Sequence, residues 1–142
     1  MSESGENLVR VLESGNGPYA QFVTIGKHVM GADEPEQRGG RDTGPSPYEL
    51  VMAGLGACTA MTVRMYAARH DWPLERAEVE VHHELIDAPE GQGKIDRFRR
   101  EITLTGSLSE EQRQRLLEIA ERCPVTRTLT RASAVVSALR QA

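Results

Sequence analysis

The sequence predicts an α+β fold in which antiparallel sheets pack around one long, buried central helix. Three observations support this class. A long apolar segment with a helix-start signal occupies residues 46–70, alternating segments joined by Gly- and Pro-rich turns lie on both sides of it, and an amphipathic segment follows residue 109. The expected order of elements is β-β-β-α-β-β-α-β. A length of 142 residues suits one domain, which we expect to span residues 1–142.

The composition is that of an ordinary soluble protein, with a net charge of −4, 27% charged and 39% hydrophobic residues. Basic residues alternate with acidic ones, so no nucleic-acid partner is expected. The uncharged stretch between Glu49 and Arg64 is only 14 residues long, which is too short for a membrane span. The first ten residues are polar and acidic, unlike a secretory signal, and therefore predict a cytoplasmic location.

Before the central helix, polar and apolar residues alternate over residues 7–13 and 19–25. The Gly- and Pro-containing segment 14–18 separates them, which predicts a β-hairpin, and residues 27–31 can add a third strand. Residues 32–45 hold three glycines and two prolines and almost no apolar side chains, so they predict a loop. A loop of this length in a compact domain is usually functional or mobile.

The central helix is expected to run from Pro47 to Arg69. Ser46 and Glu49 are spaced as in a capping box, and Pro47 fits the first helical turn. Its pattern is apolar on nearly all sides, which indicates burial. Small residues crowd its middle, and because glycine weakens a helix, they indicate that another backbone, such as a second helix, approaches closely. The small residues are Ala53, Gly54, Gly56, Ala57 and Ala60.

After the central helix, residues 77–86 and 94–106 alternate as two strands around a turn at 87–93. Ser109 and Gln112 form a second capping box before an amphipathic helix that should end near Arg122. Residues 123–129 predict a helical turn. Residues 132–139 predict a final strand, although their alanine content also permits a helix.

The two cysteines carry the main question about chemistry. A cysteine in an apolar helix, such as Cys58, is most often a structural core residue. Cys123 directly precedes Pro124 and is flanked by Arg122 and Arg127, so a helix end and nearby cations would favour an exposed thiolate. No close C-x-x-C or H-x-x-x-H spacing links the cysteines with His28, His82 or His83, so no metal or cofactor is expected.

Two segments carry a family resemblance: GPSPYELVMAGLGACTAMTVRMYA at residues 44–67 and RCPVTRTL at residues 122–129. Together with the order of elements, they resemble the OsmC/Ohr family, within its OsmC-like branch, from Val9 onward. The resemblance implies an intertwined homodimer whose central helices pack together, with sites at the subunit interface. It further implies that Cys58 attacks a hydroperoxide, that Cys123 resolves the sulfenic acid as a disulfide, and that a dithiol, such as a lipoylated protein, reduces it.

The sequence departs from the family pattern at two supporting positions. The family glutamate lies ten residues before its cysteine, where this chain has Tyr48, and Glu49 follows one place later. Glu49 is also explained by its place in the capping box. The family arginine lies in the loop between the first two strands, where residues 14–18 contain none, so Arg10, Arg38 and Arg41 are the nearest substitutes.

The predicted function is therefore thiol-dependent reduction of organic hydroperoxides in defence against oxidative stress, through a Cys58/Cys123 sulfenic acid and disulfide cycle. Two alternatives stay open. One is a non-catalytic protein that binds an apolar small molecule in the dimer groove. The other is a thiol hydrolase with Cys58 as nucleophile, although no histidine lies in an obvious base position.

Overall fold

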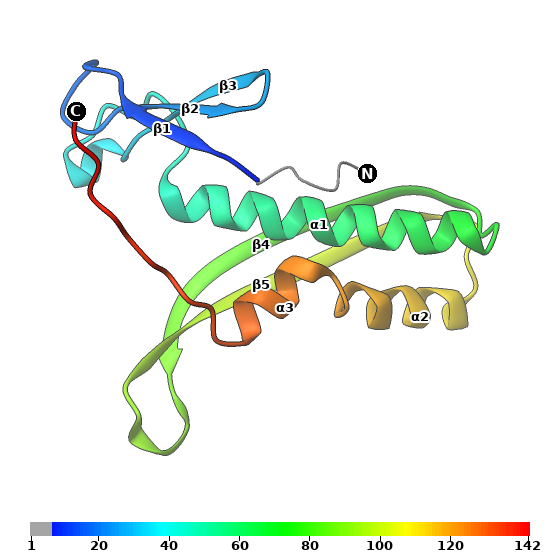
Figure 1. Cartoon of the computed structure of the whole chain (residues 1–142). Helices are drawn as coiled ribbons and strands as arrows, with labels where there is room; N and C mark the ends of the chain where they lie inside the picture. The colour runs from blue at the N-terminus through cyan, green and yellow to red at the C-terminus, as the bar shows by residue number, and fades with distance from the viewer. Residues whose placement is uncertain (1–6) are drawn as a thin grey trace. The chain divides into compact units, whose positions relative to one another are not determined.

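The computed structural model describes residues 7–142, which divide into two compact units, one ending at Val51 and one covering Met52–Ala142. Figure 1 shows the order of the elements. The first six residues of the polar segment used to predict the cellular location lie outside the described residues.

The N-terminal unit contains a three-stranded antiparallel sheet of order β1-β2-β3. Its strands are β1 (Arg10–Glu13), β2 (Gln21–Ile25) and β3 (His28–Ala32). Val11 pairs with Val23, and Phe22 pairs with Gly31. The predicted hairpin and its third strand are confirmed, with shorter strands than the alternation indicates.

The predicted loop after β3 is ordered around one buried carboxylate. Asp33 is 3% exposed and accepts hydrogen bonds from the Glu34 N–H at 2.8 Å, the Thr43 hydroxyl at 2.7 Å and the Arg41 and Thr43 N–H groups. The Thr43 hydroxyl contributes most to lowering the pKa of Asp33 below its usual value. The short 3-10 helix η1 (Glu36–Arg38) lies inside the loop. One aspartate therefore replaces the apolar anchors that this segment lacks.

The central helix α1 covers Pro47–Arg69, as predicted. Its capping box is present, because the Ser46 N–H donates to Glu49 Oε1 at 2.9 Å and the Glu49 N–H donates to Ser46 Oγ at 3.3 Å. The expected burial on all sides is not found in the single chain. One stripe with a spacing of four residues is buried, namely Leu55, Thr59, Val63 and Ala67. Other apolar side chains of α1 stay exposed, because the described chain covers one side of the helix.

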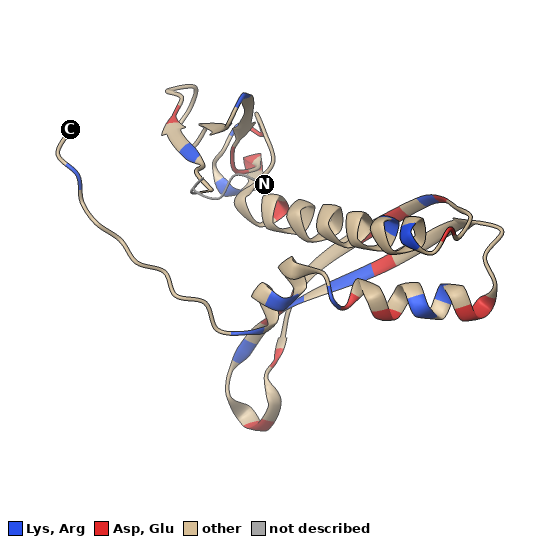
Figure 2. Cartoon of the chain, turned by 45° about the vertical axis from the view of Figure 1, so that its right-hand side comes forward, with Lys and Arg blue, Asp and Glu red and all other residues tan. Residues whose placement is uncertain are grey.

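By length and composition alone, α1 could cross a membrane, and 22% of its most apolar window is buried. Figure 2 shows the uncharged middle of the helix, with charged residues towards both ends. The Arg64 guanidinium donates to the carbonyl oxygens of Leu74 and Glu75. This contact attaches the last third of α1 to the strand that follows it.

The C-terminal unit is built on one long antiparallel hairpin. Its strands are β4 (Leu74–Asp87) and β5 (Lys94–Gly106), and the 3-10 turn η2 (Pro89–Gly91) lies between them. The register pairs Val79 with Ile102 and His83 with Phe98. The predicted alternation is confirmed, and one face of the hairpin is half-buried while the other is charged.

Helix α2 (Glu110–Ala120) begins with the predicted capping box of Ser109 and Gln112 and ends two residues earlier than expected. Together, α1, α2 and the hairpin enclose the core of this unit (Figure 1). The buried core residues are Val63, Ala67, Leu74, Leu116 and Ala120. The predicted helical turn forms α3 (Pro124–Thr130).

The predicted final strand at residues 132–139 is wrong, and the alternative helix is not found either. This segment is irregular, and Val135, Val136 and Leu139 are 90%, 92% and 100% exposed. A strand needs a neighbour to pair its backbone and cover its apolar face. Within residues 7–142 this segment has no such neighbour.

Candidate active site

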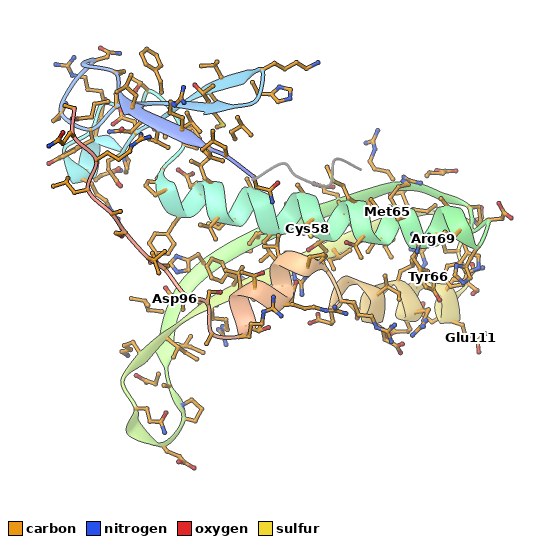
Figure 3. All side chains as sticks on the ribbon, in the orientation of Figure 1. Cys58, Met65, Tyr66, Arg69, Asp96 and Glu111 are labelled. Atoms are coloured by element: carbon orange, nitrogen blue, oxygen red, sulfur yellow. The ribbon has the colours of Figure 1, made fainter. Side chains whose placement is uncertain are left out.

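Both cysteines belong to the C-terminal unit, and both are free thiols. Cys58 lies in the middle of α1 and is half-buried (Figure 3), whereas Cys123 lies just before α3 and is fully buried. The expectation that Cys123 is exposed is therefore wrong. Ala120 at the end of α2 packs in the same core as Val63 of α1, and the Thr59 hydroxyl of α1 lies 3.8 Å from Cys123 Sγ. The sulfur is therefore buried between α1 and the end of α2.

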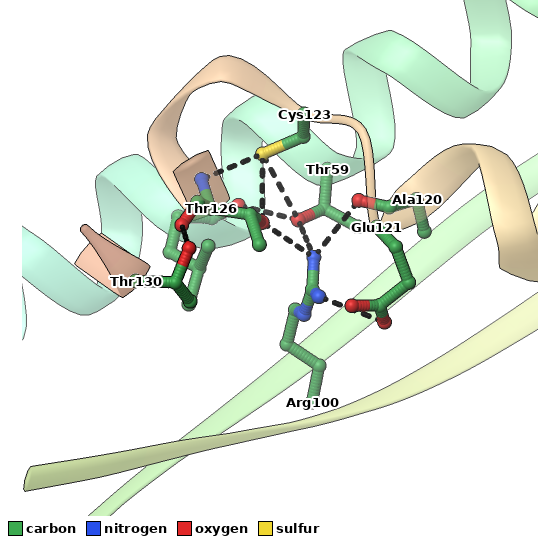
Figure 4. Close-up of polar contacts among 8 residues, drawn as sticks. Thr59, Arg100, Ala120, Glu121, Cys123, Thr126 and Thr130 are labelled. Atoms are coloured by element: carbon green, nitrogen blue, oxygen red, sulfur yellow. Dashed lines mark hydrogen bonds and ion pairs between the residues drawn. The ribbon is translucent and has the colours of Figure 1, made fainter. Parts of the chain in front are cut away.

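The sulfur of Cys123 is surrounded by hydrogen-bond donors (Figure 4). The Thr126 N–H and hydroxyl lie 3.4 Å and 3.2 Å from Cys123 Sγ, and the Thr59 hydroxyl lies 3.8 Å away. Burial raises the pKa of Cys123, but hydrogen bonds from Thr126 and Cys58 outweigh burial and lower the pKa to about 7. About half of the Cys123 thiol is therefore ionised at pH 7, and hydrogen bonds rather than the predicted cations Arg122 and Arg127 are the cause.

The pKa of Cys58 shifts in the opposite direction, upward. Burial raises the pKa of the Cys58 thiol, and the charge of Cys123 raises it further, although the Val125 N–H stabilises the Cys58 thiolate. The two cysteine side chains also share a hydrogen bond. The resting pair is therefore best described as a Cys58 thiol donating to a Cys123 thiolate.

The cation at this site is Arg100, which none of the motifs predicted. Its side chain is 10% exposed and donates to Thr59 Oγ1 at 2.9 Å, Thr126 Oγ1 at 3.1 Å and the Ala120 carbonyl at 3.2 Å. An ion pair with Glu121 at 3.1 Å partly balances its charge. Arg122 and Arg127, the cations expected from the sequence, are exposed.

A signal for Arg100 was present in the sequence. Along β5, the half-buried positions are Phe98, Arg100, Ile102 and Leu104, so strict alternation places an arginine on the apolar face. A charged side chain in phase with core residues is rarely buried without partners. Its partners come from α1, α2 and α3, which are distant in sequence, and this explains why spacing alone did not find them.

A cavity of about 370 Å³ adjoins Arg100 and Thr126. Its apolar wall is formed by Leu55, Phe98, Ile102, Leu117 and Leu129. Its polar groups are Asp96, Arg97, Arg100, Glu121, Thr126 and Thr130. The cavity is thus lined entirely by residues of the C-terminal unit and combines an apolar wall with a few polar groups, as small-molecule sites commonly do.

The four supporting residues predicted from the sequence lie in the N-terminal unit. Glu49 completes the capping box, which bears out its structural explanation, and its pKa is lowered mainly by the Ser46 N–H. Arg10 begins β1, and Arg38 ends η1. The Arg41 side chain lies against Gly17, in the loop between β1 and β2 that the resemblance implies for the arginine. Roles of these residues in thiol chemistry stay predictions.

The two histidines of the hairpin, His82 and His83, lie close to residues other than the cysteines. His83 bonds to Asp96 at 2.7 Å and stacks on Phe98. Among residues 7–142, one group of carboxylates and histidines has the spacing of a metal site, formed by Glu80, His82 and Glu101 with ligand atoms within 4.8 Å. All three side chains are exposed, and Arg99 already pairs with Glu101 at 2.7 Å. This group is a solvated charged surface.

Comparisons with known proteins agree on the fold. A protein of Psychrobacter arcticus, described as an osmotic stress induced and detoxification response protein, superposes with a TM-score of 0.72 at 17% identity, covering 90% of this chain and 91% of that one. The organic hydroperoxide resistance protein OsmC of Legionella pneumophila has a TM-score of 0.64 at 23% identity, covering 87% of this chain and 88% of that one. OhrB of Bacillus subtilis, an organic hydroperoxide resistance protein, has a TM-score of 0.58 at 22% identity, covering 84% of this chain and 88% of that one.

No functionally curated protein matches the sequence. The OsmC-like protein family matches residues 39–138, a span that contains α1, the hairpin, both cysteines and Arg100. The resemblance noted in the sequence is thereby confirmed, and so is the α+β class with two antiparallel sheets and three helices. With more than half of its residues matched and the fold shared by these solved structures, the chain belongs to the OsmC-like protein family, which includes organic hydroperoxide resistance proteins.

Proposed function

We propose that this protein reduces organic hydroperoxides with Cys58 and Cys123 as a dithiol pair. The observation that carries the proposal is the buried Cys123 sulfur, which accepts from the hydroxyl and the N–H of Thr126 and lies beside the half-buried Cys58 thiol. Two reduced cysteines with different accessibility and different acidity suit a cycle through sulfenic acid and disulfide.

In this cycle, Cys58 is the residue that meets the hydroperoxide, because Cys123 is 0% exposed. The Cys58 sulfur attacks the distal peroxide oxygen, the O–O bond breaks, and an alcohol leaves. The resulting sulfenic acid condenses with Cys123 to form a disulfide and release water. A dithiol, of the kind found in lipoylated proteins, then returns both cysteines to thiols by exchange.

The cavity supports a substrate with an apolar organic group. Leu55, Phe98 and Leu129 form an apolar wall that an alkyl or aryl group can contact. Thr126 lines the same cavity, and its hydroxyl lies 3.2 Å from the Cys123 sulfur. Because neither cysteine lines the cavity, the same observation favours a second candidate function, which is binding of an apolar small molecule without chemistry.

We further infer that a second copy of this chain covers the exposed side of α1. Met61 and Met65 are 59% and 57% exposed on a helix that is uncharged from residue 50 to residue 63. An apolar helix face of this kind is rarely left in water. A cytoplasmic location, where the thiols stay reduced, agrees with free cysteines.

The test compares the wild type with Cys58→Ser and Cys123→Ser, using cumene hydroperoxide and dihydrolipoamide. Cys58→Ser should lose hydroperoxide consumption while keeping its far-ultraviolet spectrum, because the exchange is nearly isosteric. Cys123→Ser should complete one turnover and then accumulate sulfenic acid on Cys58, detected with a sulfenic-acid probe and mass spectrometry. Equal turnover by the wild type and Cys58→Ser would eliminate the peroxidase and leave the binding function.

A further inference from the structure

The hydrogen bonds around Arg100 have a fixed direction. An arginine can only donate, so Thr126 Oγ1, which lies 3.1 Å from the guanidinium, must accept from it. The Thr126 hydroxyl has a single hydrogen, and Cys123 Sγ lies 3.2 Å from the same oxygen. The hydrogen therefore points at sulfur, and the Thr126 N–H points at the same sulfur from 3.4 Å.

Thr59 does not replace this connection. It also accepts from Arg100, at 2.9 Å, but its hydrogen is directed to the Leu55 carbonyl at 2.7 Å, which is far closer than the sulfur at 3.8 Å. Thr59 thus holds the guanidinium in place, and Thr126 transmits its charge. The guanidinium is held at both terminal nitrogens, because Nη1 also donates to the Ala120 carbonyl at 3.2 Å and Nη2 donates to Glu121 at 3.1 Å (Figure 4).

Cys123 Sγ accepts from both the hydroxyl and the N–H of Thr126, and its other neighbour with a proton to give is the Cys58 thiol. We propose that Arg100 and Thr126 are positioning residues that keep Cys123 as the resting thiolate, and that Cys123 serves as the base that takes the proton from Cys58. The proposal rests on the proposed hydroperoxide reaction for its second half, whereas the first half concerns the thiolate alone.

The proton and electron balance is complete with the hydroperoxide as oxidant. Cys123 accepts the Cys58 proton, and the Cys58 sulfur attacks the distal peroxide oxygen, which keeps its hydrogen. The O–O bond breaks, and the departing alkoxide takes the proton from Cys123 and leaves as alcohol. Cys58 is now a sulfenic acid and Cys123 a thiolate again. This thiolate attacks the Cys58 sulfur, so the disulfide forms and hydroxide leaves.

Cys123 would then act twice, first as base and later as resolving nucleophile. A resolving residue alone would influence the second step only. The base role also explains how Cys58, in mid-helix and beside another sulfur whose charge opposes its ionisation, becomes reactive at neutral pH.

The first experiment measures the Cys123 thiolate directly. The chain has two cysteines, so in a Cys58→Ser background the thiolate absorbance near 240 nm below pH 9 reports Cys123 alone, and serine keeps a donor at position 58. Thr126→Val should raise the titration midpoint by about one pH unit, because it removes one hydrogen bond to the charged form. Thr126→Ser should restore it. Thr128→Val is the matched control, since the Thr128 hydroxyl bonds to the Pro124 carbonyl instead.

The second experiment follows sulfenic acid formation on Cys58 in a single turnover with cumene hydroperoxide. In the otherwise native chain, Thr126→Val should slow this step roughly five- to tenfold at pH 6, with Thr126→Ser and Thr128→Val near the wild-type rate. Cys123→Ser should slow the same step and regain rate as the pH rises. Equal first-step rates in Cys123→Ser and the wild type would overturn the base role.

The two experiments separate the proposals. An unchanged Cys123 midpoint in Thr126→Val would overturn the relay, whether or not the protein reduces hydroperoxides. A shifted midpoint in a protein that consumes no hydroperoxide would uphold the relay and overturn both the base role and the proposed function.

Discussion

Stability should rise with pH because of one residue, Cys123. Its pKa falls from the ordinary value of 9.0 to about 7 in the folded chain. A group with a lowered folded pKa binds fewer protons in the folded state than in the unfolded state between those two values. The contribution is therefore absent below about pH 7, grows between pH 7 and pH 9, and is fully present above pH 9.

The size of this contribution to the free energy of unfolding follows from the fall of the Cys123 pKa from 9.0 to about 7. At about 1.36 kcal/mol per unit, Cys123 should add about 2.7 kcal/mol to the free energy of unfolding at pH 9 and above. The hydrogen bonds from Thr126 are the structural origin, since the Thr126 hydroxyl and N–H both stabilise the charged sulfur. The contribution is lost as the pH falls through about 7.

The assay is urea denaturation at several pH values from 6 to 9.5, in a reducing buffer and at one protein concentration, because association also changes apparent stability. The proteins compared are Cys58→Ser and the double variant Cys58→Ser/Cys123→Ser. Subtracting the two curves cancels every other titrating group. Parallel curves across this range would refute the assignment of Cys123 as a thiolate.

Three further outcomes are expected. Sedimentation at micromolar concentration should show a dimer of the 15.7 kDa chain, since Met61 and Met65 on α1 are exposed, and a folded monomer would contradict the proposed second copy. Leu116→Ala should lower the free energy of unfolding by about 2–5 kcal/mol in urea denaturation, because Leu116 is 0% exposed in the core. Leu117→Ala should lower it clearly less, because Leu117 is half-exposed, and equal losses would contradict this placement of the core. Ser109→Ala should cost about 1 kcal/mol, measured by thermal unfolding, and no change would show that α2 does not depend on its capping box.

Local signals in the sequence predicted the elements well. Ser46, Pro47 and Glu49 fixed the start of α1, and the capping box at Ser109 fixed the start of α2, because caps depend on residues a few positions apart. Alternation found four of the five strands within residues 7–142, because burial on one face of a sheet gives neighbouring residues opposite polarity. The strand predicted at residues 132–139 is wrong because a strand needs a partner, and the described chain offers none to this segment.

The limits of local signals are clearest at Asp33. It lies in a segment that composition marks only as a loop, yet it is buried and accepts hydrogen bonds from residues up to ten positions away. The burial of Cys123 was mispredicted for the same reason. Its sequence neighbours Arg122 and Arg127 indicate exposure, but the sulfur is enclosed by α1 and the end of α2, which no nearby residue reveals.

The chemistry of the site depends on which element supplies the positive charge. The resemblance implies an arginine near the first two strands, and Arg41 lies against that loop at Gly17. Arg100 supplies a second cation from β5, inside the unit that holds both cysteines. In the proposed relay, Arg100 acts through Thr126 on Cys123 and not directly on Cys58. If Cys123 is the resting thiolate and takes the proton from Cys58, as proposed, the cysteine pair can react without an arginine in the loop between β1 and β2.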